Sequence, residues 1–95
     1  MSANIAYDAI KDIVDIGIEI LREDDRRKVS RLDREFDIWF DYSNRMLDRF
    51  SRHIDPSIQT NYLRLAVKLM GPNLDGKQKL SACLNYLIES LKYVA

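Results

Sequence analysis

The chain has 95 residues, of which 46% are hydrophobic and 32% carry a charge, with only 3 Gly and 2 Pro. This composition excludes a wholly disordered chain and predicts few turns and long helices. Because 15 basic residues balance 15 acidic ones, no overall charge draws the chain to nucleic acid or to an anionic membrane. We therefore expect one all-α domain over residues 1–95.

The cysteine content and the hydropathy bear on the compartment. Cys83 is the only cysteine, which excludes an intramolecular disulfide and fits a reducing environment. No apolar run approaches the ~20 residues that span a bilayer, and the first residues lack the basic start and apolar core of a signal peptide. We expect a cytoplasmic protein with no membrane partner.

Apolar residues recur at spacings of three and four from Ile5 to Leu21, which predicts the first helix. Tyr7, Val14 and Ile18 widen this apolar face beyond the ~100° stripe of an ordinary surface helix. The acidic residues and one lysine keep to the narrow strip that remains. Such a helix is either central in the bundle or covered on its second side by another chain, and large exposed apolar patches are uncommon on monomers. If the four helices do not cover Tyr7, Val14 and Ile18 together, a homodimer through this wide face is expected.

The stretch "REDDRRKVSRLDRE", residues 22–35, is dominated by charge. A break is predicted near Glu23, where Asp24 or Asp25 can cap the next helix by accepting hydrogen bonds from its free backbone N–H groups. An apolar series at alternating spacings of three and four then runs from Val29 to Ile54. It predicts a second helix of about 40 Å that packs as in a coiled coil.

Five aromatic residues lie between positions 33 and 50, more than one helix face can use. At ~100° per residue four of them fall on the apolar seam, whereas Tyr42 lies with Ile38 on another side. That side is rich in arginine, and the opposite flank carries aspartates. The predicted partner-binding surface of this helix consists of Arg31, Arg34, Ile38, Tyr42, Arg45, Arg49 and Arg52.

Another protein is the partner that we expect for this surface. Arginine is a forked donor to carboxylate or phosphate groups, and Tyr42 and Ile38 are suitable apolar anchors. Nucleic acid is the alternative, because arginine with an interleaved aromatic suits backbone contact and base stacking, although the nearby acids would repel phosphate. The third interpretation is a solvated helix face held by ion pairs such as Asp41 with Arg45.

Proline marks the start of the third helix. Pro56 disfavours helix at Asp55, which can instead cap a helix that has Pro56 at its first position. We expect this helix over 56–70, closed by the Gly-Pro pair that follows. The short connection "GPNLD" then predicts a fourth, antiparallel helix over about 76–93.

The fourth helix carries two tyrosines, seven residues apart, on the side away from its leucines. Paired tyrosines bury much area at low entropic cost and favour interfaces, but packing on two sides within the bundle would cover them equally well. The complete set predicted for self-association is Tyr7, Val14, Ile18, Tyr86 and Tyr93.

No set of residues at catalytic spacing is found. Asp33, Asp37 and Asp41 follow one another at four-residue steps and could in principle bind a hard cation, but carboxylates on one helix face need ligands from a second element. His53, the only histidine, is expected at a helix end, and Cys83 falls on an apolar face as a small core residue. We therefore expect no enzyme, no metal and no cofactor.

These observations together predict an all-α fold, a small bundle of about four helices with a long second helix. The expected function is binding, as a small adaptor, regulator or inhibitor that docks a helical surface on another protein. In size and in lack of catalytic groups the chain is similar to accessory proteins of bacteria and their phages, including inhibitors of host or defence enzymes and small immunity proteins. That similarity is to a broad class of proteins and rests on no shared sequence motif.

Overall fold

The computed structural model describes residues 5–71 and 73–93, without the side chain of Tyr93. Within these residues the chain forms four α-helices, two short 3₁₀ helices and no strand, which confirms the predicted all-α bundle. The elements in chain order are α1 (Ile5–Asp24), α2 (Leu32–Arg49), η2 (Ser51–His53), α3 (Pro56–Met70), α4 (Gly76–Ser90) and η3 (Leu91–Tyr93).

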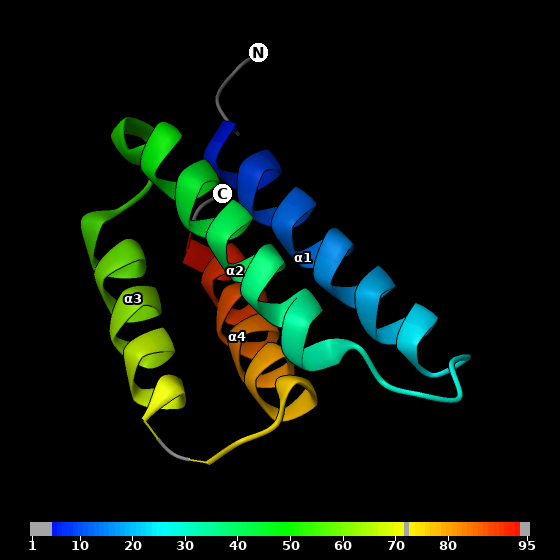
Figure 1. Ribbon diagram of the computed structural model, residues 1–95. Coiled ribbons are helices and arrows are strands. Elements are labelled where there is room, and N and C mark those ends of the chain that lie inside the picture. Colours follow the sequence, from blue (N-terminus) through cyan, green and yellow to red (C-terminus); the bar gives the residue numbers. More distant parts are fainter. Residues whose placement is uncertain (1–4, 72, 94–95) are drawn as a thin grey trace.

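The first two helices lie side by side and run in opposite directions, as Figure 1 shows. α4 packs against both of them, so that α1, α2 and α4 enclose the centre of the molecule. α3 stands at the edge and packs chiefly on α4, its antiparallel neighbour as predicted. In none of the helices described is there a stretch both long and apolar enough to cross a bilayer.

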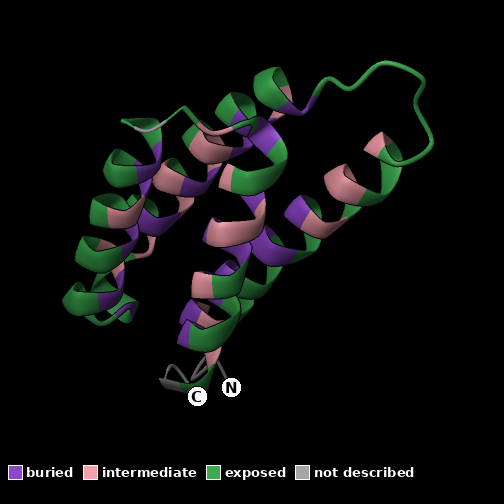
Figure 2. Ribbon diagram, turned by 90° about the horizontal axis from the view of Figure 1, so that it is seen from below, coloured by how far each residue is buried: buried purple, intermediate pink, exposed green. Residues whose placement is uncertain are grey.

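The break between α1 and α2 is longer than the sequence predicted. Residues 25–31 form an exposed loop, and α2 begins only at Leu32 (Figure 2). The Asp24 carboxylate accepts hydrogen bonds from the Ser30 hydroxyl at 2.9 Å and the Arg31 N–H at 3.0 Å. The predicted N-cap at Asp24 or Asp25 is therefore wrong, because Asp24 instead holds the far end of the loop. The loop has one apolar side chain, Val29, which is 76% exposed, so no burial favours helix there.

α2 is long, with 18 residues, but it stops well before the predicted end at Ile54. The chain passes through η2, and Ile54 then adopts an extended conformation and is buried. The next boundary agrees with the prediction. The Asp55 carboxylate accepts a hydrogen bond from the Ser57 N–H at 2.9 Å, and Pro56 occupies the first position of α3. A cap formed by neighbours in the sequence was predictable, whereas the chain reversal after α2 was not.

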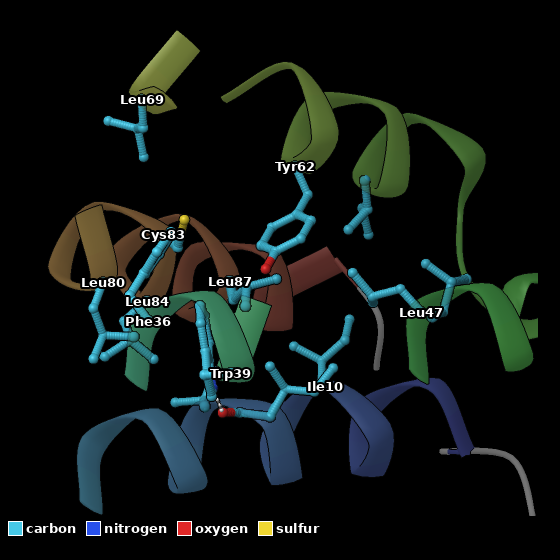
Figure 3. Close-up of a cluster of buried hydrophobic side chains, with 14 of the residues drawn as sticks. Ile10, Phe36, Trp39, Leu47, Tyr62, Leu69, Leu80, Cys83, Leu84 and Leu87 are labelled. Atoms are coloured by element: carbon cyan, nitrogen blue, oxygen red, sulfur yellow. Dashed lines mark hydrogen bonds between the residues drawn. The ribbon is translucent and has the colours of Figure 1, made fainter. Parts of the chain in front are cut away.

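The largest buried side chain of the core is Trp39, which lies between α1, α2 and α4 (Figure 3). Its N–H donates a hydrogen bond to the Ile13 carbonyl of α1 at 2.9 Å. Gly17 makes this approach possible, because a Cβ atom there would lie 2.6 Å from Leu84 Cδ2 and 3.1 Å from the indole nitrogen. The packing of the three helices at this point therefore depends on a residue that has no side chain.

A second junction joins the start of α2 to the start of α4. The Asp33 carboxylate accepts a hydrogen bond from the Gly76 N–H at 2.6 Å, and a Cβ atom on Gly76 would overlap the backbone of Leu32. A carboxylate at a helix N-terminus also favours the helix dipole. Asp33 is thus a structural cap for α4, a role that the sequence did not predict.

Candidate functional site

The outer side of the α1–α2 pair is hollowed between the two helices, with a volume of about 350 Å³. We call this hollow the α1–α2 groove. Its lining residues are Ile16 and Ile20 from α1 and Ile38, Trp39, Tyr42 and Arg45 from α2.

The groove leaves apolar side chains open to solvent. Ile38 is 61% exposed and Ile16 is 40% exposed, and they lie on opposite sides of the hollow. Tyr42 is half-buried and packs against the hydrophobic core. The floor is Trp39, which is only 2% exposed. The groove is thus a shallow apolar surface laid directly over the core.

Three of the seven residues predicted for partner binding, Ile38, Tyr42 and Arg45, come together in this groove. The structure adds Ile16 and Ile20, which sequence reasoning had assigned to the covered face of the first helix. Both lie at one edge of that face, and the pattern of the chain does not say which edge a neighbouring helix will cover. The only feature of the sequence that could have indicated their exposure is their position at the border of the apolar arc.

The other four predicted residues are exposed arginines outside the groove lining. Arg34 and Arg49 project from the same outer side of α2, and Arg49 lies over the Phe50 ring at 5.6 Å. Arg31 and Arg52 are not part of the helix, since Arg31 is the N-cap of α2 and Arg52 lies in η2. The predicted single stripe on one long helix is therefore shorter than expected.

Arginines form one rim of the groove. We call Arg34, Arg45 and Arg49 the basic rim, because their positions on α2 place them beside Ile38 and Tyr42. Arg45 bonds Asp41 at 2.9 Å, as predicted, through two highly exposed side chains. Among the described residues, the other pair that the sequence suggests at this spacing, Asp48 with Arg52, does not form.

Acids form the opposite rim. Asp12, Glu19 and Glu23 are exposed and lie on α1 next to Ile16 and Ile20, and we call them the acidic rim. Two of them are paired on their own side, Glu19 with Arg22 at 4.0 Å and Glu23 with Arg26 at 3.2 Å. In the part of the chain described, no ion pair crosses the groove from one rim to the other. The surface therefore has an apolar centre between two opposite charges.

The residues predicted for self-association lie on the other flank of α1 and on α4. Val14 is 4% exposed, because α4 and η3 pack against α1 on this side, so its assignment to a surface between two chains is wrong. Tyr7 and Ile18 are half-buried. The Tyr86 hydroxyl donates to the Ile58 carbonyl at 3.3 Å, which ties α4 to α3. The side chain of Tyr93 lies outside the described residues.

The outer face of α3 carries a second set of exposed apolar side chains. Val67 is 72% exposed, Met70 51% and Leu63 40%. The only charged residues of α3 are Arg64 and Lys68, and the helix contains no acid. This face is thus apolar and basic, whereas the α1–α2 groove has rims of both signs.

The buried polar groups do not form a reactive site. Burial raises the pKa of the Cys83 thiol to about 12, so at neutral pH the thiol keeps its proton. Burial also raises the pKa of Tyr62. His53 is exposed on η2. In residues 5–71 and 73–93, no three His, Cys, Asp or Glu side chains gather closely enough to hold a metal ion.

Comparison of the chain with protein-family models, with curated proteins and with solved structures finds no match in any of the three.

Proposed function

We propose that the protein is a non-enzymatic protein–protein interaction module, and that the α1–α2 groove with its basic rim is the docking surface. The observation that carries the proposal is the apolar centre of the groove, where Ile38 is 61% exposed beside Tyr42 and Ile16. An apolar centre surrounded by a polar rim is the usual anatomy of a protein interface. In this role the chain is a small adaptor, regulator or inhibitor.

The side chains of the groove are of the kinds that contribute most to protein binding. Tyrosine and arginine are enriched among the residues whose truncation weakens interfaces most. Tyr42 is already half-buried against the core, so burying the rest of its ring costs little conformational entropy. The exposed pair of Arg45 with Asp41 is worth only about 0.2–0.5 kcal/mol, so Arg45 can exchange this carboxylate for one on a partner.

Two further features belong to this proposal. We place the protein in the cytoplasm, because its one cysteine is a buried free thiol that does not depend on an oxidising compartment. Small size and docking without catalysis suit an accessory protein of a bacterium or a phage, such as an inhibitor of a host or defence enzyme.

The rival function is nucleic-acid binding through the basic rim. Arg34 and Arg49 favour it, since in the described part of the chain neither has an ion pair. The acidic rim across the groove and Asp41 behind Arg45 weigh against it, because they repel phosphate. An electrophoretic mobility shift at low and at moderate salt separates the two functions. A complex that weakens steeply as salt rises would support nucleic acid as the partner.

The proposal is tested by capture with the immobilised protein from a lysate of its native host. The variant carrying Tyr42→Ala and Arg45→Glu changes two groove residues that are not fully buried, so it should keep the circular dichroism spectrum of the wild type. We expect this variant to lose the captured protein. The matched control, Leu63→Ala with Arg64→Glu, makes the same kind of change on α3 and should keep it. If the groove variant captures its partner as well as the wild type does, the groove is only solvated surface.

A further inference from the structure

We infer that the α1–α2 groove binds a second copy of this chain, about a two-fold axis that runs parallel to α1 and α2 in the plane of the interface. This inference rests on the proposed docking role of the groove and names its occupant. The reason is that the acidic rim and the basic rim lie on one surface of one molecule, on either side of an apolar centre. Such a surface is complementary to itself.

The orientation of the axis follows from the signs of the rims. α1 and α2 lie side by side and antiparallel (Figure 1). A two-fold axis parallel to them places α1 of each copy over α2 of the other, so each acidic rim faces a basic rim. An in-plane axis perpendicular to the helices would place α1 over α1 and bring acid against acid. Like charges across an interface are strongly unfavourable, which selects the parallel axis.

Rotation about this axis leaves the position of each residue along the helix direction unchanged. At the end of the groove near the start of α1, the residues of α1 and α2 that lie at the same level can be identified. Asp12 lines a neighbouring hollow together with Met46 and Phe50. It therefore lies level with the turn of α2 that carries Arg45 and Arg49. In the dimer Asp12 of one copy meets these arginines of the other.

The second end gives the same result. Ile20 and Ile38 line the groove together. Glu23 lies one turn after Ile20 on α1, and Arg34 lies one turn before Ile38 on the antiparallel α2. Glu23 of one copy therefore lies level with Arg34 of the other. Both ends of the interface thus join opposite charges, each twice by symmetry.

The apolar centre completes the interface. Ile16, Ile38 and Tyr42 lie near the axis, where the second copy covers their exposed parts. α1 and α2 together present a face of roughly 30 by 20 Å, or about 600 Å², from a rise of ~1.5 Å per residue and a helix width of ~10 Å. Specific complexes bury about 800 Å² per partner, so this is a small interface, and we expect a dissociation constant in the micromolar range.

The exposed stripe on α3, formed by Leu63, Val67 and Met70, does not compete for this role. Its charged neighbours, Arg64 and Lys68, are both basic, and α3 has no acid to meet them. Two copies joined through α3 would place like charges together. The α1–α2 groove differs from the flank of α1 that the sequence predicted for self-association. On that flank Val14 is buried within the chain.

The test uses two variants with reversed rims and sedimentation velocity from about 1 μM to about 1 mM protein, the range over which a micromolar dimer forms. The first carries Asp12→Arg and Glu23→Arg, and the second carries Arg34→Glu and Arg49→Glu. Each variant alone brings like charges together, and we expect its self-association to weaken at least ~10-fold. Mixed in equal amounts, the two variants should form a heterodimer as strong as the wild-type dimer, because every contact again joins opposite charges.

All four changed residues are exposed, so circular dichroism should show wild-type helix content in both variants. The control, Arg64→Glu with Lys68→Glu on α3, should dimerise as the wild type does. A wild-type chain that stays monomeric at about 1 mM overturns the inference, and so does a mixture that fails to associate. The capture experiment decides separately whether the groove docks a different protein: loss of that protein from the Tyr42→Ala, Arg45→Glu variant, with a monomeric wild type, leaves the docking role intact.

Discussion

Trp39 and Tyr62 are the two largest side chains that are fully buried, and they differ in whether their polar atom has a hydrogen-bond partner. The Trp39 N–H donates to the Ile13 carbonyl at 2.9 Å. The Tyr62 hydroxyl is buried and has no hydrogen-bond partner in the described structure, and its ring instead stacks on Phe40 with centroids 5.7 Å apart. Trp39 belongs to the α1–α2–α4 core, whereas Tyr62 attaches α3 to it.

This difference teaches that the two regions are held by different means. The α1–α2–α4 core combines close packing at Gly17 with a satisfied polar group, and it specifies one arrangement of its helices. α3 is held by apolar and ring contacts alone at its centre, with one weak hydrogen bond from Tyr86 to Ile58 at its start. We expect the core to carry most of the stability and α3 to open first.

The largest effect should follow from removing the Trp39 ring. Trp39→Ala leaves a cavity among three helices and is expected to lower the free energy of unfolding by about 3–5 kcal/mol, measured by urea denaturation followed by circular dichroism. Trp39→Phe keeps an aromatic ring but loses the hydrogen bond to Ile13, and should cost about 1–2 kcal/mol. Equal losses for the two variants would show that packing at this site matters less than the hydrogen bond.

Alkaline pH should destabilise the protein through the buried thiol of Cys83. Burial raises its pKa from the ordinary 9.0 to about 12 in the folded chain, so above pH 9 the unfolded chain loses this proton first. The stabilisation is therefore complete below pH 9 and declines as the pH rises towards 12, by up to about 1.4 kcal/mol per pH unit. Urea midpoints from pH 8 to 11 measure the decline. Cys83→Ala should flatten the part of this decline that lies below the ordinary tyrosine pKa of about 10, above which the raised pKa of the buried Tyr62 adds a decline of its own.

Hydrogen exchange should separate the two regions directly. The backbone amides of α3 are expected to exchange about 10- to 100-fold faster than those of α4, because α3 can open while the α1–α2–α4 core stays folded. Exchange measured residue by residue by NMR checks this difference. Equal protection of α3 and α4 would mean that the whole bundle opens as one unit and that the contrast drawn between the two regions is wrong.

Glycine should be required in the core and dispensable at the end of α3. Gly17→Ala introduces a Cβ atom that overlaps Leu84 and the Trp39 indole, at a cost of about 1–3 kcal/mol that a gain in helix propensity of about 1 kcal/mol offsets in part. Gly71→Ala is the matched control, since Gly71 has helical dihedral angles and its Cβ atom would meet only the Lys68 carbonyl at an ordinary 3.6 Å. Thermal unfolding should show a lower melting temperature for the first variant alone.

The smallest effect, and one of opposite sign, is expected at Tyr62. Tyr62→Phe removes a buried hydroxyl that has no partner among the described residues, so the free energy of unfolding should stay the same or rise by up to about 1 kcal/mol. Tyr86→Phe loses its hydrogen bond to Ile58 and should cost about 0.5–1 kcal/mol. Urea denaturation compares the two. A clear loss for Tyr62→Phe would reveal a hydrogen bond from this hydroxyl in solution.

Local patterns foretold much of the fold. α3 begins and ends as predicted, because Asp55 and Pro56 form a start signal that neighbouring residues complete by themselves. The start of α2 was misplaced, because an aspartate in the charged stretch can cap a helix or hold a loop, and Asp24 bonds Ser30 and Arg31 from a distance. A cap is predictable where its acceptor and donor are close in sequence, and unpredictable where they are not.

The sequence predicted about half of the residues that form the candidate site. Ile38 and Tyr42 were recognised, because they lie among arginines on a side of their helix that is distinct from its apolar seam. Ile16 and Ile20 were missed, since they continue an apolar arc whose central residues are buried. Whether the edge of such an arc is covered depends on the angle and distance of the neighbouring helix, which follow from contacts such as that of Gly17 with Trp39.

The sequence by itself determined that the chain is helical, where α3 starts and ends, and which side of each helix is apolar, because turn residues and periodicity act within a few neighbouring positions. Only the tertiary structure decided which flank of α1 stays open and that acidic and basic rims face each other across one groove. Those outcomes depend on how the helices pack, and packing joins residues that are far apart in the chain.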